Sequence, residues 1–149
     1  MTLSEILRSG QETLLGKRVA AVSDPEVNVR TTIVTFEEML AGRIIQLNPK
    51  DPKKPRLEPL FNRYSLLQET YRELQRYYPP LPFDVNAQTV YNAIPPNVKN
   101  QTRALDCRIA SIAVSLGKGH IVITQNQKDF RRIEEVIGVE WDDWTITPI

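Results

Sequence analysis

The stretch of sequence that decides the fold is LDCRIASIAVSLGKGHIVITQNQKDF, residues 105–130. Its first half spaces apolar residues along one helical face, and Asp106 lies in line with them. His120 to Thr124 then alternates like a buried strand, and a polar run that ends at Asp129 is predicted to form a loop. In open parallel α/β sheets, ligands bind beyond the carboxyl ends of the strands. Asn126 and Asp129 are therefore predicted near the mouth of a crevice that Asp106 shares.

The composition is typical of one compact globular domain. The chain has 149 residues, 41% of them hydrophobic, which is enough for one core and too little for two ordinary domains. The formal charge of +1 excludes a protein that is basic all over, so a nucleic acid would need a local patch. A lone cysteine, with no stretch like a signal peptide or a membrane span, predicts a cytoplasmic protein with no membrane association.

Strands and helices are predicted to alternate along the chain, and this order indicates an α/β fold with a parallel sheet. A loop rich in Pro and Lys over residues 48–59 separates two of the helices. Thr35 is the expected N-cap of the helix that carries Glu38. Besides the helix of Asp106, the predicted helices span residues 3–15, 37–47, 60–77 and 85–93, and the predicted strands span residues 29–36, 81–84, 120–124 and part of the tail from 136 to 149.

Two acids, Glu38 and Asp106, stand just inside predicted helices on separate elements. Taken singly, each fits a capping residue, because the helix dipole favours negative charge at an N-terminus. Clustered carboxylates also suit Mg²⁺ or Mn²⁺, which prefer oxygen ligands and activate water for phosphodiester cleavage. With one His and one Cys in the chain, neither a zinc site nor a nucleophilic triad is predicted.

Three blocks of the sequence resemble the conserved blocks of PIN domains, in particular the VapC-like toxins of bacterial toxin–antitoxin pairs. The first block is VTFEEMLAG (34–42), whose family form T-x-x-E-x-x-x-G is satisfied by Thr35, Glu38 and Gly42. The second is LDCRIASIA (105–113), which places Asp106 ahead of an apolar helix.

The third block is ITQNQKDF (123–130), which resembles the family form T-x-N/D-x-x-D/H-F. The segment WDDWT (141–145) resembles the family's closing segment. The order and spacing of all these blocks are more specific than any one of them. The residues that match the third block are Thr124, Asn126, Asp129 and Phe130.

The resemblance implies a single PIN-like domain over residues 1–149, of three-layer α/β/α type with a parallel sheet, that acts as a metal-dependent endoribonuclease. Glu38 and Asp106 would hold Mg²⁺ or Mn²⁺ directly or through water. Asn126 would be a weaker ligand or would orient a water, and Asp129 would add charge near the ion or have a structural role. The implied partners are an RNA substrate, a cognate antitoxin and a second copy in a homodimer.

The sequence departs from the family at its start. PIN domains open with a central apolar strand that ends in the first metal-binding Asp, whereas this chain begins Met1-Thr2-Leu3-Ser4-Glu5, which matches only the part of the family pattern after that Asp. The start is internal to a longer natural chain, or the product is a degenerate relative, or another chain donates the strand. We predict that a chain with this start cleaves RNA poorly or not at all, and the alternative function is a non-catalytic remnant that binds an antitoxin or dimerises.

Basic residues and tyrosines are interleaved along the loop and the helix over residues 60–77. Cations that neutralise phosphates, with aromatics that stack on bases, would make an RNA-facing surface, and a module that binds RNA without cleaving it is a third hypothesis. The competing interpretation is a solvated loop beside an amphipathic helix whose tyrosines pack on the core or in a dimer. The candidate RNA-binding residues are Arg43, Lys53, Lys54 and Arg56.

Overall fold

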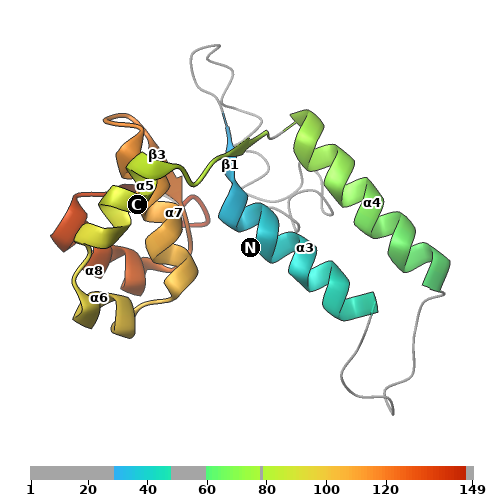
Figure 1. Cartoon of the computed structure of the whole chain (residues 1–149), viewed down its shortest axis with the longest axis horizontal. Helices are drawn as coiled ribbons and strands as arrows, with labels where there is room; N and C mark the ends of the chain where they lie inside the picture. The colour runs from blue at the N-terminus through green and yellow to red at the C-terminus, as the bar shows by residue number, and fades with distance from the viewer. Residues whose placement is uncertain (1–28, 48–59, 78, 147–149) are drawn as a thin grey trace. The chain divides into compact units, whose positions relative to one another are not determined.

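A computed structural model describes residues 29–47, 60–77 and 79–146 of the chain. Contacts divide these residues into two compact units, one of residues 30–82 and one that begins at Phe83 (Figure 1). Each unit contains one pair of short parallel strands flanked by helices. The predicted α/β class with parallel pairing is therefore confirmed, while the single domain over residues 1–149 stays a prediction. The predicted helix over residues 3–15 and the predicted loop over residues 48–59 lie outside the described part of the chain.

The unit of residues 30–82 is built on two helices that run in opposite directions (Figure 1). Strand β1 (Thr31–Thr32) leads directly into helix α3 (Ile33–Leu47), and helix α4 (Leu60–Tyr77) leads to strand β2 (Pro80–Leu81). The two strands pair in parallel, with Thr31 opposite Pro80 and Thr32 opposite Leu81. The rings of Phe36 and Tyr71 join the helices in an edge-to-face contact, with their centroids 5.7 Å apart.

The predicted strand over residues 29–36 is wrong after Thr32, because α3 begins at Ile33. The side-chain oxygen of Thr32 accepts the backbone N–H of Thr35 at 3.1 Å, which is the hydrogen bond of a helix N-cap. Thr35 is therefore inside the helix and is not its cap. The same shift moves Glu38 to the second turn of α3, so the predicted capping role of Glu38 is also wrong.

Helix α4 has the predicted bounds but buries only part of the predicted apolar face, which is Leu60, Tyr64, Leu67, Tyr71 and Leu74. The apolar stripe expected to pack contains Tyr64 and Tyr71, and both side chains are exposed. Leu74, the last residue of the predicted stripe, is fully buried as predicted, whereas the other buried positions, Arg63 and Thr70, each lie one residue before a tyrosine of that stripe. The buried face is therefore rotated toward Arg63 and Thr70, and the two tyrosines remain on the surface of this unit.

The unit that begins at Phe83 holds the blocks from Asp106 onward. Asp84 caps helix α5 by accepting the backbone N–H groups of Asn86 and Ala87, so the predicted strand over residues 81–84 is shorter than expected. Strands β3 and β4 pair in parallel, with Ile121 opposite Glu140. The elements in order are α5 (Val85–Ala93), α6 (Pro96–Gln101), α7 (Ala104–Ser115), β3 (Ile121–Ile123), α8 (Gln127–Ile137) and β4 (Glu140–Asp142).

Two expectations about the central block are corrected. The polar run before Phe130 is not all loop, because α8 begins at Gln127 and buries Phe130 and Ile133 on one face. Strand β3 is not fully buried either, since the side chain of Ile121 is 56% exposed. Only Val122, which points the other way, packs against the core.

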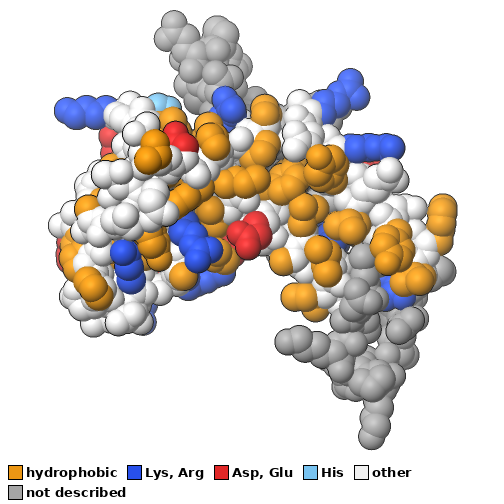
Figure 2. Space-filling model, viewed as in Figure 1, with side chains coloured by type: hydrophobic (Ala, Val, Ile, Leu, Met, Phe, Trp, Pro, Cys, Tyr) orange, Lys and Arg blue, Asp and Glu red, His pale blue; other side chains and the backbone are white. Residues whose placement is uncertain are grey.

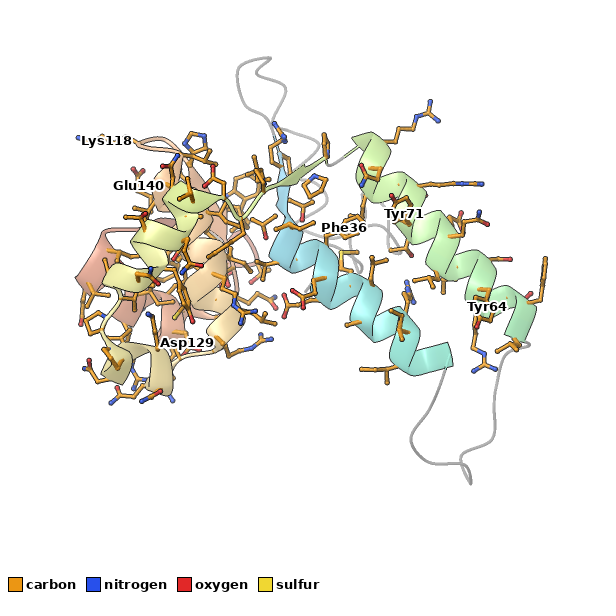
Figure 3. The ribbon with its side chains drawn as sticks, viewed as in Figure 1. Phe36, Tyr64, Tyr71, Lys118, Asp129 and Glu140 are labelled. Carbon is orange, nitrogen blue, oxygen red and sulfur yellow. The ribbon has the colours of Figure 1, made fainter. Side chains whose placement is uncertain are left out.

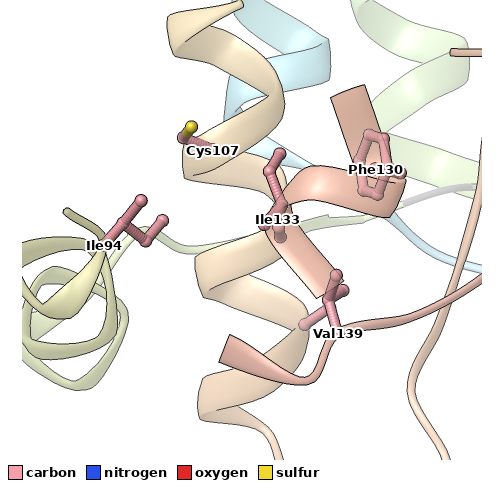
Figure 4. Close-up of a cluster of buried hydrophobic side chains, with 7 residues drawn as sticks. Ile94, Cys107, Phe130, Ile133 and Val139 are labelled. Atoms are coloured by element: carbon pink, nitrogen blue, oxygen red, sulfur yellow. The ribbon is translucent and has the colours of Figure 1, made fainter. Parts of the chain in front are cut away.

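The core of this unit lies between α7, α8 and the ends of α5 and β4 (Figure 4). Cys107 is fully buried there and acts as a packing residue. Because Cys107 faces the core, the turn of α7 that also carries Asp106 packs against that core. The core side chains are Ile94, Cys107, Ala110, Ala113, Phe130, Ile133 and Val139.

Candidate functional site

Asp106 lies in the first turn of α7 and is almost completely buried, with 7% of its surface exposed. Burial raises the pKa of its carboxyl group above the ordinary value, because the charged form loses contact with water. A hydrogen bond from Asn126 and the positive charge of Arg103 act in the opposite direction. A buried carboxylate at this place is unfavourable for stability and is typical of a functional site.

The turn after β3 brings Asn126 to Asp106. The backbone N–H of Asn126 donates to the side-chain oxygen of Thr124 at 3.0 Å, which fixes the turn. The side-chain Nδ2 of Asn126 then donates to Asp106 Oδ2 at 2.6 Å and to Asp129 Oδ2 at 3.1 Å. The structure thus brings together three of the four residues that the sequence predicts for the catalytic site.

Asp129, labelled in Figure 3, lies in the first turn of α8. Its side chain is also buried, with 7% of its surface exposed. Besides the bond from Asn126, its Oδ2 accepts the backbone N–H of Arg103 at 2.9 Å. Arg103 is the N-cap residue of α7, and its side chain makes no capping hydrogen bond. One carboxylate oxygen therefore joins α8, the turn after β3 and the beginning of α7.

Glu38 belongs to the other compact unit, on α3, where its side chain is partly buried. Its predicted role as a metal ligand together with Asp106 stays a prediction.

The donor chemistry of the cluster fits an oxygen-binding cation only in part. Mg²⁺ is commonly held by one or two carboxylates together with water, and Asp106 and Asp129 supply two carboxylates. Asn126, however, presents its amide nitrogen to both of them, so in this orientation its oxygen is not directed at the carboxylates. Among the residues that the structure describes, no group of three or more His, Cys, Asp or Glu side chains is placed to hold a metal ion.

Of the four predicted RNA-binding residues, the structure describes Arg43 alone. Arg43 lies on α3 with 8% of its surface exposed, and its contact with RNA phosphates stays a prediction. Lys53, Lys54 and Arg56 lie outside the described residues.

Large apolar side chains are exposed on the unit of residues 30–82. They lie on α3 and α4, and part of this surface is seen in Figure 2. Phe61 has the most exposed side chain of the group, at 78%. We call this set the apolar helix surface, and its members are Ile44, Ile45, Leu60, Phe61, Tyr64 and Tyr71.

Sequence reasoning missed Arg103 and Arg132, which belong to the surroundings of the acids. Arg103 donates its backbone N–H to Asp129, and Arg132 donates a side-chain hydrogen bond to the backbone oxygen of Gln101 at 2.9 Å. Neither contact leaves a local signal, because the partners are 26 and 31 residues apart. The only hint in the sequence is the spacing of Asp129 and Arg132, which puts both on one face of a helix.

Comparison with solved structures shows a likeness over almost the whole chain. The chain resembles a structure of VapBC-1 from nontypeable Haemophilus influenzae, with a TM-score of 0.67, 20% sequence identity, and coverage of 97% of this chain and 95% of that one. The likeness shows the fold, which is the α/β fold that the sequence predicts. No protein-family model matches the sequence, and the search among curated proteins found no match. None of the helices that the structure describes has the length and apolar character needed to cross a membrane.

Proposed function

We propose that this chain carries the site of a metal-dependent endoribonuclease of the VapC toxin type, with Asp106 as its central acid. The observation that carries the proposal is the buried Asp106 carboxylate, held by Asn126 at the carboxyl end of a parallel strand. That is the place where open α/β folds bind their ligands. The shared fold with VapBC-1 and the three sequence blocks that resemble PIN domains support the same assignment.

Asp106 and Glu38 are the proposed ligands of Mg²⁺ or Mn²⁺. When bound, such an ion activates water and stabilises the leaving oxygen of a phosphodiester. The chain's own contribution is to hold Asp106 in a fixed orientation at low water exposure, through the 2.6 Å hydrogen bond from Asn126. Asn126 is proposed either to turn its amide oxygen to the ion as a weaker ligand or to orient a water.

A protein partner is proposed for the apolar helix surface. Exposed apolar patches are typical of protein–protein contacts, and the members of this surface lie on two helices of one unit that contact each other. The structural match is VapBC-1, and the sequence resembles toxins that pair with an antitoxin. We therefore propose a cognate antitoxin, or a second copy of the chain, as the partner of this surface.

The second candidate function is a non-catalytic remnant that only binds such a partner. It is favoured by the incomplete donor set among the described residues, where no three acids, histidines or cysteines are placed for one ion. It predicts that the apolar helix surface binds its partner without any cation at Asp106.

A Mn²⁺ titration of the purified chain, followed by electron paramagnetic resonance of free Mn²⁺, separates the two functions. The enzyme hypothesis predicts that Asp106→Asn weakens Mn²⁺ binding. The loss should exceed the about 10- to 100-fold that is expected when a residue that only orients a ligand is removed. Asp84→Asn is the matched control, because it removes one charge in the same unit and Asn remains a good helix cap. Equal Mn²⁺ binding in the wild type and Asp106→Asn contradicts the metal site, and no binding by the wild type supports the remnant.

RNA cleavage gives the second measurement. Weak cleavage that needs Mg²⁺, stops with EDTA and disappears in Asp106→Asn or Glu38→Gln supports the nuclease. Cleavage that survives both substitutions contradicts the proposed site. RNA binding that is equally strong with EDTA, in the absence of cleavage, supports a module that only binds RNA.

A further inference from the structure

Helix α8 contacts the junction between α6 and α7 with two side chains from one face. Asp129 accepts the backbone N–H of Arg103, and Arg132 donates to the backbone oxygen of Gln101. Residues three apart on a helix lie side by side, so the two bonds act on the same short junction. One bond satisfies an N–H at the beginning of α7 and the other satisfies a carbonyl at the end of α6, groups that a helix cannot satisfy by itself.

Asp129 supplies a cap that the sequence of α7 lacks. Arginine is a poor N-cap residue, and Arg103 makes no side-chain capping bond. In a common arrangement, an acid at the third helical position reaches back to the N–H of the cap residue, and Asp106 occupies that third position. Here the N–H of Arg103 donates to Asp129, so the Asp106 carboxylate is directed to Asn126 instead.

The same oxygen of Asp129 also fixes the amide of Asn126. Asp129 Oδ2 accepts from Arg103 at 2.9 Å and from Asn126 Nδ2 at 3.1 Å, while Asn126 donates to Asp106 at 2.6 Å. The chain of contacts therefore runs from the beginning of α7, through α8, and back to the acid in the first turn of α7. A carboxylate oxygen that accepts two hydrogen bonds is already occupied by protein donors.

We propose that Asp129 is a positioning residue, and not a metal ligand, that holds Asp106 and Asn126 in place by capping α7 from a neighbouring helix. The inference rests on the proposed function for its effect on cation binding. Its structural part, the hold on Arg103 and Asn126, can be measured without any cation. The role requires an oxygen acceptor at residue 129 but does not require a negative charge.

The test compares Asp129→Asn with Asp129→Ala in the full chain. The amide oxygen of Asn can take the place of Asp129 Oδ2 and accept both hydrogen bonds, whereas Ala accepts neither. We expect Asp129→Ala to weaken Mn²⁺ binding about 10- to 100-fold and Asp129→Asn to keep it within about threefold of the wild type, an order-of-magnitude allowance for context. Asp106→Asn, which removes a proposed ligand, should lose more than either.

Asp84→Ala is the matched control. It removes the cap of α5 in the same unit, with the loss of bonds to two backbone N–H groups, and both of those groups belong to α5 itself. If Asp129 acted only through general stability, Asp84→Ala would weaken Mn²⁺ binding as much as Asp129→Ala does. We expect Asp84→Ala to bind Mn²⁺ like the wild type, and equal losses in the two variants would overturn the proposal.

A measurement without metal separates this proposal from the proposed function. Nuclear magnetic resonance is expected to show faster hydrogen exchange at the Arg103 amide and shifted side-chain NH₂ signals of Asn126 in Asp129→Ala, with both restored in Asp129→Asn. If the wild type binds no Mn²⁺, the proposed metal site fails, and these signals alone decide whether Asp129 holds Arg103 and Asn126.

Two results would overturn the positioning role. Loss of Mn²⁺ binding in Asp129→Asn as complete as in Asp106→Asn would show that the negative charge of residue 129 is needed, as for a ligand. If hydrogen exchange at the Arg103 amide and the side-chain NH₂ signals of Asn126 are unchanged in Asp129→Ala, Asp129 does not fix these two residues. If Asp129→Ala does not fold, Asp129→Asn still decides, because a ligand predicts lost binding and a positioning residue predicts retained binding.

Discussion

Asn126 donates its side-chain nitrogen to Asp106 at 2.6 Å, although the two residues are 20 positions apart in the sequence. The same nitrogen reaches Asp129, so one amide group lies between two buried carboxylates. An amide N–H is the neutral group best suited to this place, because it offers hydrogen to both acids without a third negative charge. The amide of Asn126 therefore explains how the two acids stay close to each other.

Replacing this amide by a carboxylate should destabilise the folded protein. Asn126→Asp removes two hydrogen bonds and places a third acid beside Asp106 and Asp129. We expect a loss of about 1–3 kcal/mol in the free energy of unfolding at neutral pH without metal. Added Mn²⁺ should restore stability, because the proposed metal site exists only in the folded state.

Thermal unfolding with and without Mn²⁺ measures this effect. Gln88→Glu makes the same amide-to-acid change on exposed α5, where the side chain of Gln88 donates to Asn92, and should change the midpoint little. A variant Asn126→Asp that is as stable as the wild type without metal would show that the amide is not needed between the acids.

The Asp106 carboxylate should lower the free energy of unfolding at neutral pH. Its pKa is raised mainly by burial, so the carboxyl group ionises less readily in the folded state than in the unfolded state. The wild type therefore loses stability as the pH rises from the ordinary value of 3.8 through the raised pKa, and Asp106→Asn does not.

We expect Asp106→Asn to raise the thermal midpoint at pH 7 by a few degrees, and to give no gain below the ordinary pKa of the carboxyl group. Unfolding curves of both proteins across this pH range, without divalent ions, provide the measurement. A gain of the same size at every pH would point to packing instead of ionisation.

The core between α7 and α8 should be sensitive to lost volume at Ile133. Its side chain is fully buried, so Ile133→Ala should cost about 2–5 kcal/mol, measured by urea unfolding. Val136→Ala on the same helix is the control, because Val136 is exposed and should change stability by only about 0.5 kcal/mol. Similar losses in both variants would mean that α8 does not pack through the Ile133 face.

The turn after β4 should depend on Thr145. The hydrogen bond from the Thr145 hydroxyl is the largest cause that lowers the pKa of Asp143, and Gln127 adds a further bond from the beginning of α8. Thr145→Val should therefore raise the pKa of Asp143 toward its ordinary value, as followed by carbon-13 resonance in a pH titration. Gln127→Leu should raise it less, and an unchanged pKa in Thr145→Val would remove Thr145 as the cause.

The apolar helix surface should govern association with other proteins. Phe61 has the largest exposed fraction of this set, so Phe61→Asp should leave the fold within about 0.5 kcal/mol of the wild type. Sedimentation velocity is expected to show weaker self-association of Phe61→Asp than of the wild type. The exposed polar neighbour Asn62 provides the control Asn62→Asp, and a variant Phe61→Asp that sediments like the wild type would exclude this surface from a homodimer.

Local patterns in the sequence determined much of the fold. Helices α4 and α5 begin and end at the predicted residues, because prolines and a capping Asp84 mark their ends. The alternation of strands and helices predicted parallel pairing, which both strand pairs confirm. The position of Asn126 and Asp129 after a predicted parallel strand also predicted that they lie near a crevice shared with Asp106, and Asn126 does contact both acids.

The tertiary structure decided what a local pattern cannot encode. Thr32 caps α3 in place of the predicted Thr35, and the tyrosines of α4 lie on the surface. Both results depend on which face of a helix finds a packing partner. Asp129 accepts the hydrogen bond from Arg103, 26 residues away, only because α8 packs against the beginning of α7. Sequence periodicity fixes the face on which a side chain lies, but hydrogen bonds between distant elements form only where packing brings those faces together.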